Sequence, residues 1–334
     1  MQIVAYRNCL VPCLCLAAVG EAIAGLPKGK DSVERLKADV YHLASDTLEG
    51  RGISTPGIGL AAEHIRAEFQ RIGLKSGTPG GSYYQQFKYR SNSKSEPARA
   101  LHNVIGVLES KREVASETIV IGAHYDHLGY GQVGSPAPET LRGRIHPGAD
   151  DNASGTAAML ELARRFASRG TPPRRRMVFV AFCAEEAGRI GSHHYASKEP
   201  IFPIRDTVAM INFDMVGRLR NHELGVAGDE SAREFRDLLA GADDKSPLKL
   251  RLGGPEYPGD SDHASFSAVG VPILYVCTGS HEDRHTPADT ADKINYEGMA
   301  KVVDFCEDVL DRMLVMSRPR FIPAPKRRSP GGPK

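Results

Sequence analysis

The stretch FVAFCAEEAGRIGSHHY (Phe179 to Tyr195) begins as an apolar run and then places two glutamates side by side. The apolar part is typical of a strand buried inside a sheet. Glu185 and Glu186 follow where that strand is expected to end, although repulsion between the carboxylates and their desolvation both oppose this placement. A positively charged partner at this edge of the sheet would offset that cost.

The chain from Leu101 onward alternates strand-like apolar runs with amphipathic helical ones. The expected strands are NVIGVL, TIVIGAHY, MVFVAF, VAMINFD and VPILYVC, and the expected helices lie near Ser154 to Ser168, Ile190 to Ser197, Glu230 to Ala240, Asp262 to Val269 and Tyr296 to Met313. This alternation predicts an α/β fold with a mixed, largely parallel central sheet and helices on both faces. Helical spacing also predicts two earlier helices, over Ser32 to Ala44 and Gly59 to Ile72.

The composition, with 41% hydrophobic and 25% charged residues among 334, is that of a globular protein. Residues 1–24 have an early cation at Arg7, an apolar centre and the small-x-small pattern Ala22-Ile23-Ala24. These features predict a secretory signal cleaved near Ala24, and hence a secreted or periplasmic protein. A membrane anchor or a buried helix is the alternative, but the apolar core is short for a bilayer span and no later segment is long enough.

The rest of the chain shows no repeat or long linker, so residues 25–317 are predicted to form one domain. Residues 318–334, RPRFIPAPKRRSPGGPK, are basic and rich in proline and glycine, which predicts a disordered tail. A polyanion- or envelope-binding role for the tail is the alternative. Outside the signal only Cys183, Cys277 and Cys306 remain, an odd number. Cys183 and Cys277 lie in strand-like apolar runs, which favours small buried thiols over a disulfide framework.

In open α/β sheets, ligands bind beyond the carboxyl ends of the strands. The polar residues expected near these ends are imidazoles and carboxylates: His124, Asp126, Asp150, Asp151, Glu185, Glu186, Asp214 and His285. Such a mixture of nitrogen and oxygen donors suits a borderline divalent cation, usually zinc. With three or more carboxylates and two histidines available, two metals are more plausible than one, because a shared carboxylate relieves anionic crowding.

Each candidate residue also has a purely structural interpretation. Asp150 and Asp151 could cap the following helix, and Glu185 and Glu186 could interact with a helix dipole. These separate interpretations do not explain why each strand expected to end at this edge of the sheet is followed by a side chain that can bind a metal ion. Adjacent strand-end residues point in different directions, so Glu186 can bind metal while Glu185 acts as general base on the bound water.

The set AHYDHLG, GADDNASG, CAEEAGRIGSHHY, INFDMVG, GDSDHASF and HTPADT resembles, in the same order, the motifs of the M28 family of zinc aminopeptidases. The resemblance spans residues 124 to 290. The segment LASDTLEGRG…GLAAEHIRAEFQRIGL also resembles the leader helices of exported, bacterial-type members. The resemblance implies a three-layer sandwich like that of the zinc exopeptidases.

Carried over by position, the resemblance implies two zinc ions and five ligands: His124 and Asp214 on one zinc, Glu186 and His285 on the other, and Asp150 bridging them. Glu185 matches the general base of the family. Asp126 matches the carboxylate that orients the ring of His124, a role that its position two residues later also suggests. A cis peptide is expected between Asp150 and Asp151.

Several residues depart from the family pattern or have no assigned role. Arg284 stands where some members have an aromatic residue, and it could hold a substrate carbonyl or carboxylate, or lie on the surface. Tyr257 lies near the place where some relatives use a tyrosine to stabilise the oxyanion. The motif Ser261-Asp262-His263 is expected to cap the following helix, and His127 has no assigned role. The stretch from Leu128 to Pro147 is expected to form a wall or lid of the cleft.

The leading hypothesis is an exported two-zinc aminopeptidase that acts on peptides with a free N-terminus. Three alternatives stay open: a glutaminyl cyclase, a carboxypeptidase-type member of the same fold, and a non-catalytic binding ectodomain. The cyclases of this fold line their pockets with tryptophan, which this chain lacks, and binding ectodomains typically lose ligands that are all present here. No nucleic-acid partner is expected, and the sequence predicts neither the oligomeric state nor the preferred substrate residue.

Overall fold

The computed structural model describes residues 30–90, 98–110, 116–132, 134–141, 143–244, 246–253 and 261–323. The predicted signal, Tyr257 and the tail beyond Pro323 lie outside these residues. Cys183, Cys277 and Cys306 are free and buried, as expected. Within the described ranges, no helix combines the length and apolar character needed to cross a bilayer. The division into signal, single domain and tail stays a prediction.

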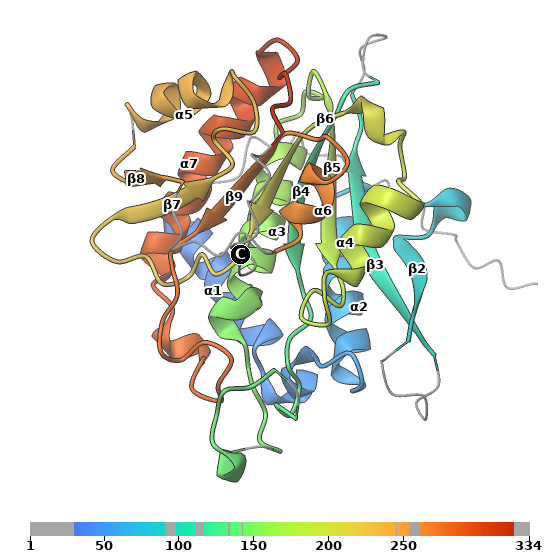
Figure 1. Cartoon of the computed structure of the whole chain (residues 1–334), viewed down its shortest axis with the longest axis vertical. Helices are drawn as coiled ribbons and strands as arrows, with labels where there is room; N and C mark the ends of the chain where they lie inside the picture. Colours follow the sequence, from blue (N-terminus) through green and yellow to red (C-terminus); the bar gives the residue numbers. More distant parts are fainter. Residues whose placement is uncertain are drawn as a thin grey trace, which may run out of the picture.

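A central sheet with the strand order β1-β3-β5-β4-β6-β9-β7-β8, and with β2 paired to β3, organises the described chain (Figure 1). The strands are β1 (Lys75–Ser76), β2 (Tyr84–Tyr89), β3 (Arg99–Leu108), β4 (Thr118–His124), β5 (Arg176–Phe182), β6 (Thr207–Phe213), β7 (Glu223–Ala227), β8 (Lys249–Leu252) and β9 (Ile273–Cys277). Neighbours among β5, β4, β6 and β9 are parallel, whereas β3 and β7 run antiparallel to them. The predicted mixed, largely parallel sheet is therefore confirmed.

The parallel strands end together at one edge of the sheet. His124 of β4 pairs with Phe182 of β5, and Phe213 of β6 pairs with Val276 of β9. Every residue of β4, β6 and β9 is buried, because helices cover both faces of these strands. This register brings the residues that follow β4, β5 and β6 into one neighbourhood.

Helices pack on both faces of the sheet (Figure 1). One face carries α1 (Lys30–Leu43), α2 (Gly57–Arg71), α3 (Gly155–Ala167), α5 (Phe235–Asp243) and α7 (Tyr296–Val315), and the other carries α4 (Ile190–His193) and α6 (His263–Ser267). The helix predicted from Glu230 begins only at Phe235. The one predicted over Ile190 to Ser197 is a short α-helix that continues as a π turn over His194–Lys198.

Buried arginines of α3 tie the helical layer together. Arg164 donates to Asp39 on α1 at 3.0 Å and to Glu68 on α2 at 2.7 Å. The next residue, Arg165, reaches Glu307 on α7 at 2.9 Å. Burial opposes ionisation of Glu68, but hydrogen bonds from Arg71 and Arg164 lower its pKa to about 2. The helices are thus joined by charge-assisted bonds as well as by apolar packing.

This network predicts a loss of stability in acid. Unfolded Glu68 takes up a proton near its ordinary pKa of 4.5, whereas the folded protein keeps it ionised down to about 2. Its contribution to the free energy of unfolding is therefore complete above pH 4.5 and declines as the pH falls towards 2. Urea unfolding of Glu68→Gln should show a shallower decline over this window than the wild type. Glu34→Gln on the exposed side of α1 is the control, and equal slopes in all three proteins would contradict the account.

Candidate metal centre

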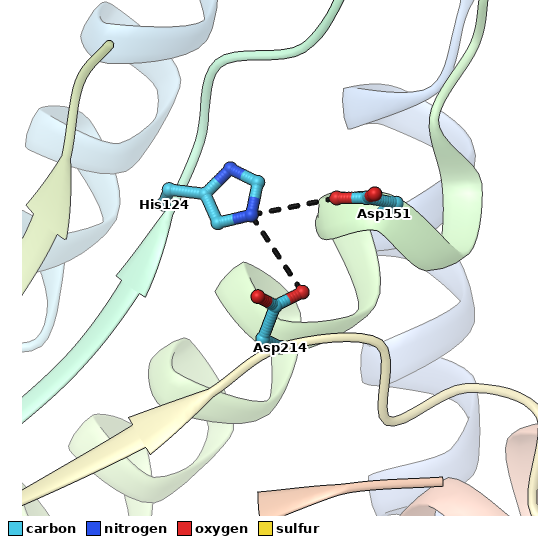
Figure 2. A group of neighbouring side chains, drawn as sticks. All are labelled: His124, Asp151 and Asp214. Carbon is cyan, nitrogen blue, oxygen red and sulfur yellow. Dashed lines mark ion pairs between the residues drawn. The ribbon is translucent and has the colours of Figure 1, made fainter. Parts of the chain in front are cut away.

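Side chains from three parts of the chain meet beyond the ends of the parallel strands. His124 is the last residue of β4, and Asp214 follows the last residue of β6. Asp151 lies in the π turn Ala149–Ser154 that leads into α3. Figure 2 shows Asp151 and Asp214 both pointing towards the same ring nitrogen of His124. All three side chains are buried or nearly so.

The geometry around His124 suits a cation. Its Nε2 lies 3.4 Å from Asp151 Oδ1 and 3.7 Å from Asp214 Oδ1. Its Nδ1 donates to the backbone carbonyl of Asp126 at 3.1 Å, so Nε2 is the ring nitrogen that faces the two carboxylates. Burial opposes protonation of His124, yet the nearby carboxylates of Asp151 and Asp214 raise its pKa well above its usual value. The site therefore demands a positive charge at this position.

A second group of ligand types lies on the other side of Asp151. His285 Nε2 is 2.9 Å from Asp151 Oδ2 and 3.3 Å from Glu186 Oε2. Its Nδ1 donates to the carbonyl of Gly134 at 3.3 Å, which leaves Nε2 free to act as a ligand. Against burial, the nearby carboxylates of Asp151 and Glu186 raise the pKa of His285 to about 10. The two oxygens of Asp151 thus face two different histidines.

The spacing of these atoms fits a zinc coordination sphere. Tetrahedral ligands with bonds of about 2.0–2.2 Å lie roughly 3.3–3.6 Å from one another. The four distances given above run from 2.9 to 3.7 Å and join only imidazole nitrogens and carboxylate oxygens. His124, Asp151 and Asp214 form one potential metal-binding group, and His127, Asp151 and Glu186 form another. The donor set is one that zinc accepts.

Asp150, the expected bridging residue, faces away from both histidines of this centre. Its Oδ1 accepts from the backbone N–H of Gly217 at 2.6 Å and from Ser154 Oγ at 3.0 Å. Its Oδ2 lies 3.0 Å from His281 Nε2. Asp151, and not Asp150, is therefore the candidate ligand that lies between the two histidines. Two consecutive aspartates look alike in sequence, and only the path of the turn decides which one faces the centre.

The turn that carries Asp151 is held by side chains distant in sequence. Asp289 Oδ2 accepts from the backbone N–H groups of Asp150 and Asp151 at 2.9 and 3.0 Å. Asn152 Nδ2 donates to the carbonyl of Phe213, at the end of β6, at 2.9 Å. The cis peptide expected between Asp150 and Asp151 lies one bond later, between Asp151 and Asn152. The turn is therefore fixed to the sheet and to the loop after β9.

Asp126 has a different geometry from the one expected. Its carboxylate is 3.9 Å from His124 Nδ1, beyond hydrogen-bond range, and its backbone carbonyl contacts the ring instead. The carboxylate accepts from the N–H groups of Glu185 and Glu186 at 3.0 and 3.3 Å. Because β4 and β5 are adjacent and end together, Asp126 can reach the turn after β5. It thus holds the main chain of both glutamates.

Glu185 lies in a strongly anionic environment. Burial, opposed by the charge of His124, raises its pKa well above the usual value, and Asp262 and Asp214 raise it further. Asp262 belongs to the motif that was expected to cap α6, but it is buried and makes no capping hydrogen bond at the start of this helix. Burial raises the pKa of Asp262 to about 7, although His124 opposes the shift.

Arg51 is a structural residue that the sequence did not single out. It is fully buried, and its guanidinium donates to the carbonyls of Tyr125, Leu43, Pro147 and Gly148 at 2.6 to 2.8 Å. These bonds join the segment after β4 to the segment that leads into the Asp151 turn. In the sequence, its position within the turn-rich stretch TLEGRG was the one feature that could have drawn attention to this arginine.

The rim of the centre contains one of the predicted substrate residues. Arg284 is partly exposed, and its Nε donates to Asp151 Oδ2 at 3.1 Å. Part of the stretch predicted as a wall also reaches this rim, since Ser135 Oγ donates to the carbonyl of His285 at 3.0 Å. A role for Arg284 in substrate binding stays a prediction.

Comparison with known proteins identifies the class to which this fold and site belong. Residues 103–310 match peptidase family M28, which is more than half of the chain, so the chain belongs to this family. It is 33% identical over 199 residues to the alkaline phosphatase isozyme conversion protein of Escherichia coli, covering 58% of this chain and 55% of that protein. It is 28% identical over 245 residues to aminopeptidase YwaD of Bacillus subtilis, covering 70% and 49%. The chain thus spans about half the length of these curated relatives.

Solved structures confirm the fold. A Zn-dependent exopeptidase from Parabacteroides distasonis superposes with a TM-score of 0.66 at 19% identity, covering 86% of this chain and 98% of that one. The glutaminyl cyclase of Porphyromonas gingivalis superposes with a TM-score of 0.68 at 16% identity, covering 84% and 98%. At these identities the likeness supports the architecture and not the activity.

The position of the shared carboxylate can be tested with paired variants. Asp151→Asn should weaken zinc binding at least about 10-fold, because it removes a charged oxygen from both donor groups. Asp150→Asn should keep the zinc content and lower only the thermal stability, since it weakens the contacts with Gly217, Ser154 and His281. Zinc content after dialysis and the Tm of the metal-free proteins are the measurements. The opposite pattern would restore Asp150 as the bridging residue.

Proposed function

We propose that this protein is an exported aminopeptidase that uses two zinc ions to remove the N-terminal residue from peptides. The observation that carries the proposal is the arrangement of Asp151, whose oxygens lie 3.4 Å from His124 Nε2 and 2.9 Å from His285 Nε2. A carboxylate between two histidine-containing groups is in a position to bridge two metal ions. Membership in peptidase family M28 agrees with it.

His124 and Asp214 would hold one zinc, Glu186 and His285 the other, and Asp151 both. When bound, the ions polarise the scissile carbonyl and lower the pKa of a water molecule. The hydrogen bonds of His124 Nδ1 and His285 Nδ1 to backbone carbonyls keep both Nε2 atoms directed at the site. The ligands are therefore oriented before substrate arrives.

Glu185 is proposed as the general base. Its backbone N–H donates to Asp126, which holds the residue next to the proposed metal ligands. It would take a proton from the attacking water and pass it to the amine that leaves.

Replacing Glu185 by glutamine separates proton transfer from metal binding. Because the amide keeps the size of the side chain and cannot accept the proton, Glu185→Gln should retain zinc and lose about 10²–10⁴-fold in kcat. Hydrolysis of aminoacyl nitroanilides and zinc analysis of the same preparation measure the two effects. Wild-type turnover in this variant would exclude Glu185 as the base.

Product analysis distinguishes the proposed reaction from its alternatives. A carboxypeptidase has one observation in its favour, since Arg284 at the rim could bind a terminal carboxylate. With a glutamine-initiated peptide, we expect release of the free N-terminal residue, and no reaction after N-terminal acetylation. Loss of ammonia would indicate a cyclase, and release of the C-terminal residue a carboxypeptidase. Either result would contradict the proposal.

The proposed site of action is outside the cytoplasm. It rests on the predicted signal in residues 1–24, with its early Arg7 and the Ala22-Ile23-Ala24 pattern. Peptides with a free N-terminus are the proposed partners.

A further inference from the structure

We propose that His127 is a positioning residue that fixes Glu186 as a ligand and thereby sets the affinity of one of the two metal positions, the one formed with His285. This inference rests on the proposed function, because it assigns a role within the same two-metal centre. It concerns a histidine for which neither the motifs nor the proposed ligand set provide a role.

The ring of His127 is buried and its main chain is anchored. Its side chain has no exposed surface, and its backbone N–H donates to the carbonyl of Arg51 at 3.2 Å. On the other side, Gly148 lies against the ring: a Cβ at Gly148 would stand 2.5 Å from Cδ2 of His127. His285 packs edge-on, with the ring centroids 5.7 Å apart. These contacts leave the ring little freedom to turn.

The two oxygens of Glu186 have separate partners. Oε1 lies 2.9 Å from His127 Nδ1, and Oε2 lies 3.3 Å from His285 Nε2. With Oε1 held by His127, Oε2 is the oxygen presented to the position that His285 and Asp151 share. Glu186 cannot swing away from this position without breaking the bond to His127.

The surroundings of Nε2 decide whether His127 donates a proton to Glu186 or binds metal itself. Nε2 of His127 is buried and has no hydrogen-bond partner among the described residues. If Nδ1 bound metal, the ring proton would sit on Nε2 as an unpaired buried donor, which is rare in proteins. If Nδ1–H donates to Glu186, Nε2 carries only a lone pair. The geometry therefore assigns His127 as a hydrogen-bond donor.

The effect of His127 should be confined to one metal position. The other position, formed by His124 and Asp214, shares only Asp151 with it, and His124 is oriented by the carbonyl of Asp126. A loss of the bond to Glu186 should thus weaken one metal and spare the other. A merely structural role would lower stability without this selectivity.

Two substitutions at His127 provide the test. His127→Leu removes the donor while keeping an apolar side chain in the site. His127→Asn places an amide N–H near the position of Nδ1 and can still donate to Glu186. His102→Leu, on β3, is the control for loss of a histidine elsewhere. The affinities of the full-length proteins for zinc are measured by competition with a chelator, together with the Tm of each metal-free protein.

We expect two zinc ions in the wild type and in His102→Leu. His127→Leu should bind one ion with unchanged affinity and the other about 10–100-fold more weakly. His127→Asn should recover most of that loss. Unchanged affinities in His127→Leu would overturn the inference and leave the proposed function intact. So would a folded His127→Asn as weak as His127→Leu, since the ring itself would then be needed. Fewer than two ions in the wild type would overturn the proposed function as well.

Discussion

The structure depends on a concentration of buried carboxylates where the parallel strands end. Asp151, Glu186 and Asp214 converge there because β4, β5 and β6 finish at one edge of the sheet. Carboxylates removed from water destabilise a fold unless a positive charge accompanies them. The same carboxylates raise the pKa of His124 and His285, because a protonated ring would supply such a positive charge. Divalent cations would supply it more fully, and they would bring hydrolytic chemistry with them.

The fold holds these carboxylates in place through bonds that do not involve a metal. Asp126 accepts from the N–H groups of both glutamates, and Asp289 accepts from those of the turn that contains Asp151. Arg51 joins the segments on either side of this turn through four backbone carbonyls. Such a supporting layer would keep the proposed ligands oriented. The proposed role of His127 extends the same layer to Glu186.

The elements that could be predicted are those whose burial requires a simple pattern of apolar residues in the sequence. Continuous apolar runs predicted β4, β5, β6 and β9, because these strands are covered on both faces. The edge strand β2 (YQQFKY) contains two adjacent glutamines and neither a continuous apolar run nor a clean alternation, so it was missed, as was the short β7, which contains a glycine. Within the site, ligand types were predictable, but Asp150 and Asp151 were indistinguishable until the turn was seen. Arg51 and His127 were missed because their partners are backbone carbonyls or a glutamate far along the chain.

The most direct test of the central claim is a crystal structure of the zinc-loaded protein with anomalous scattering recorded at the zinc edge. The account predicts two peaks about 3.5–4 Å apart with one oxygen of Asp151 bound to each. Glu186 and His285 should contact one peak, and His124 and Asp214 the other. A single peak, or two peaks bridged by Asp150, would contradict it.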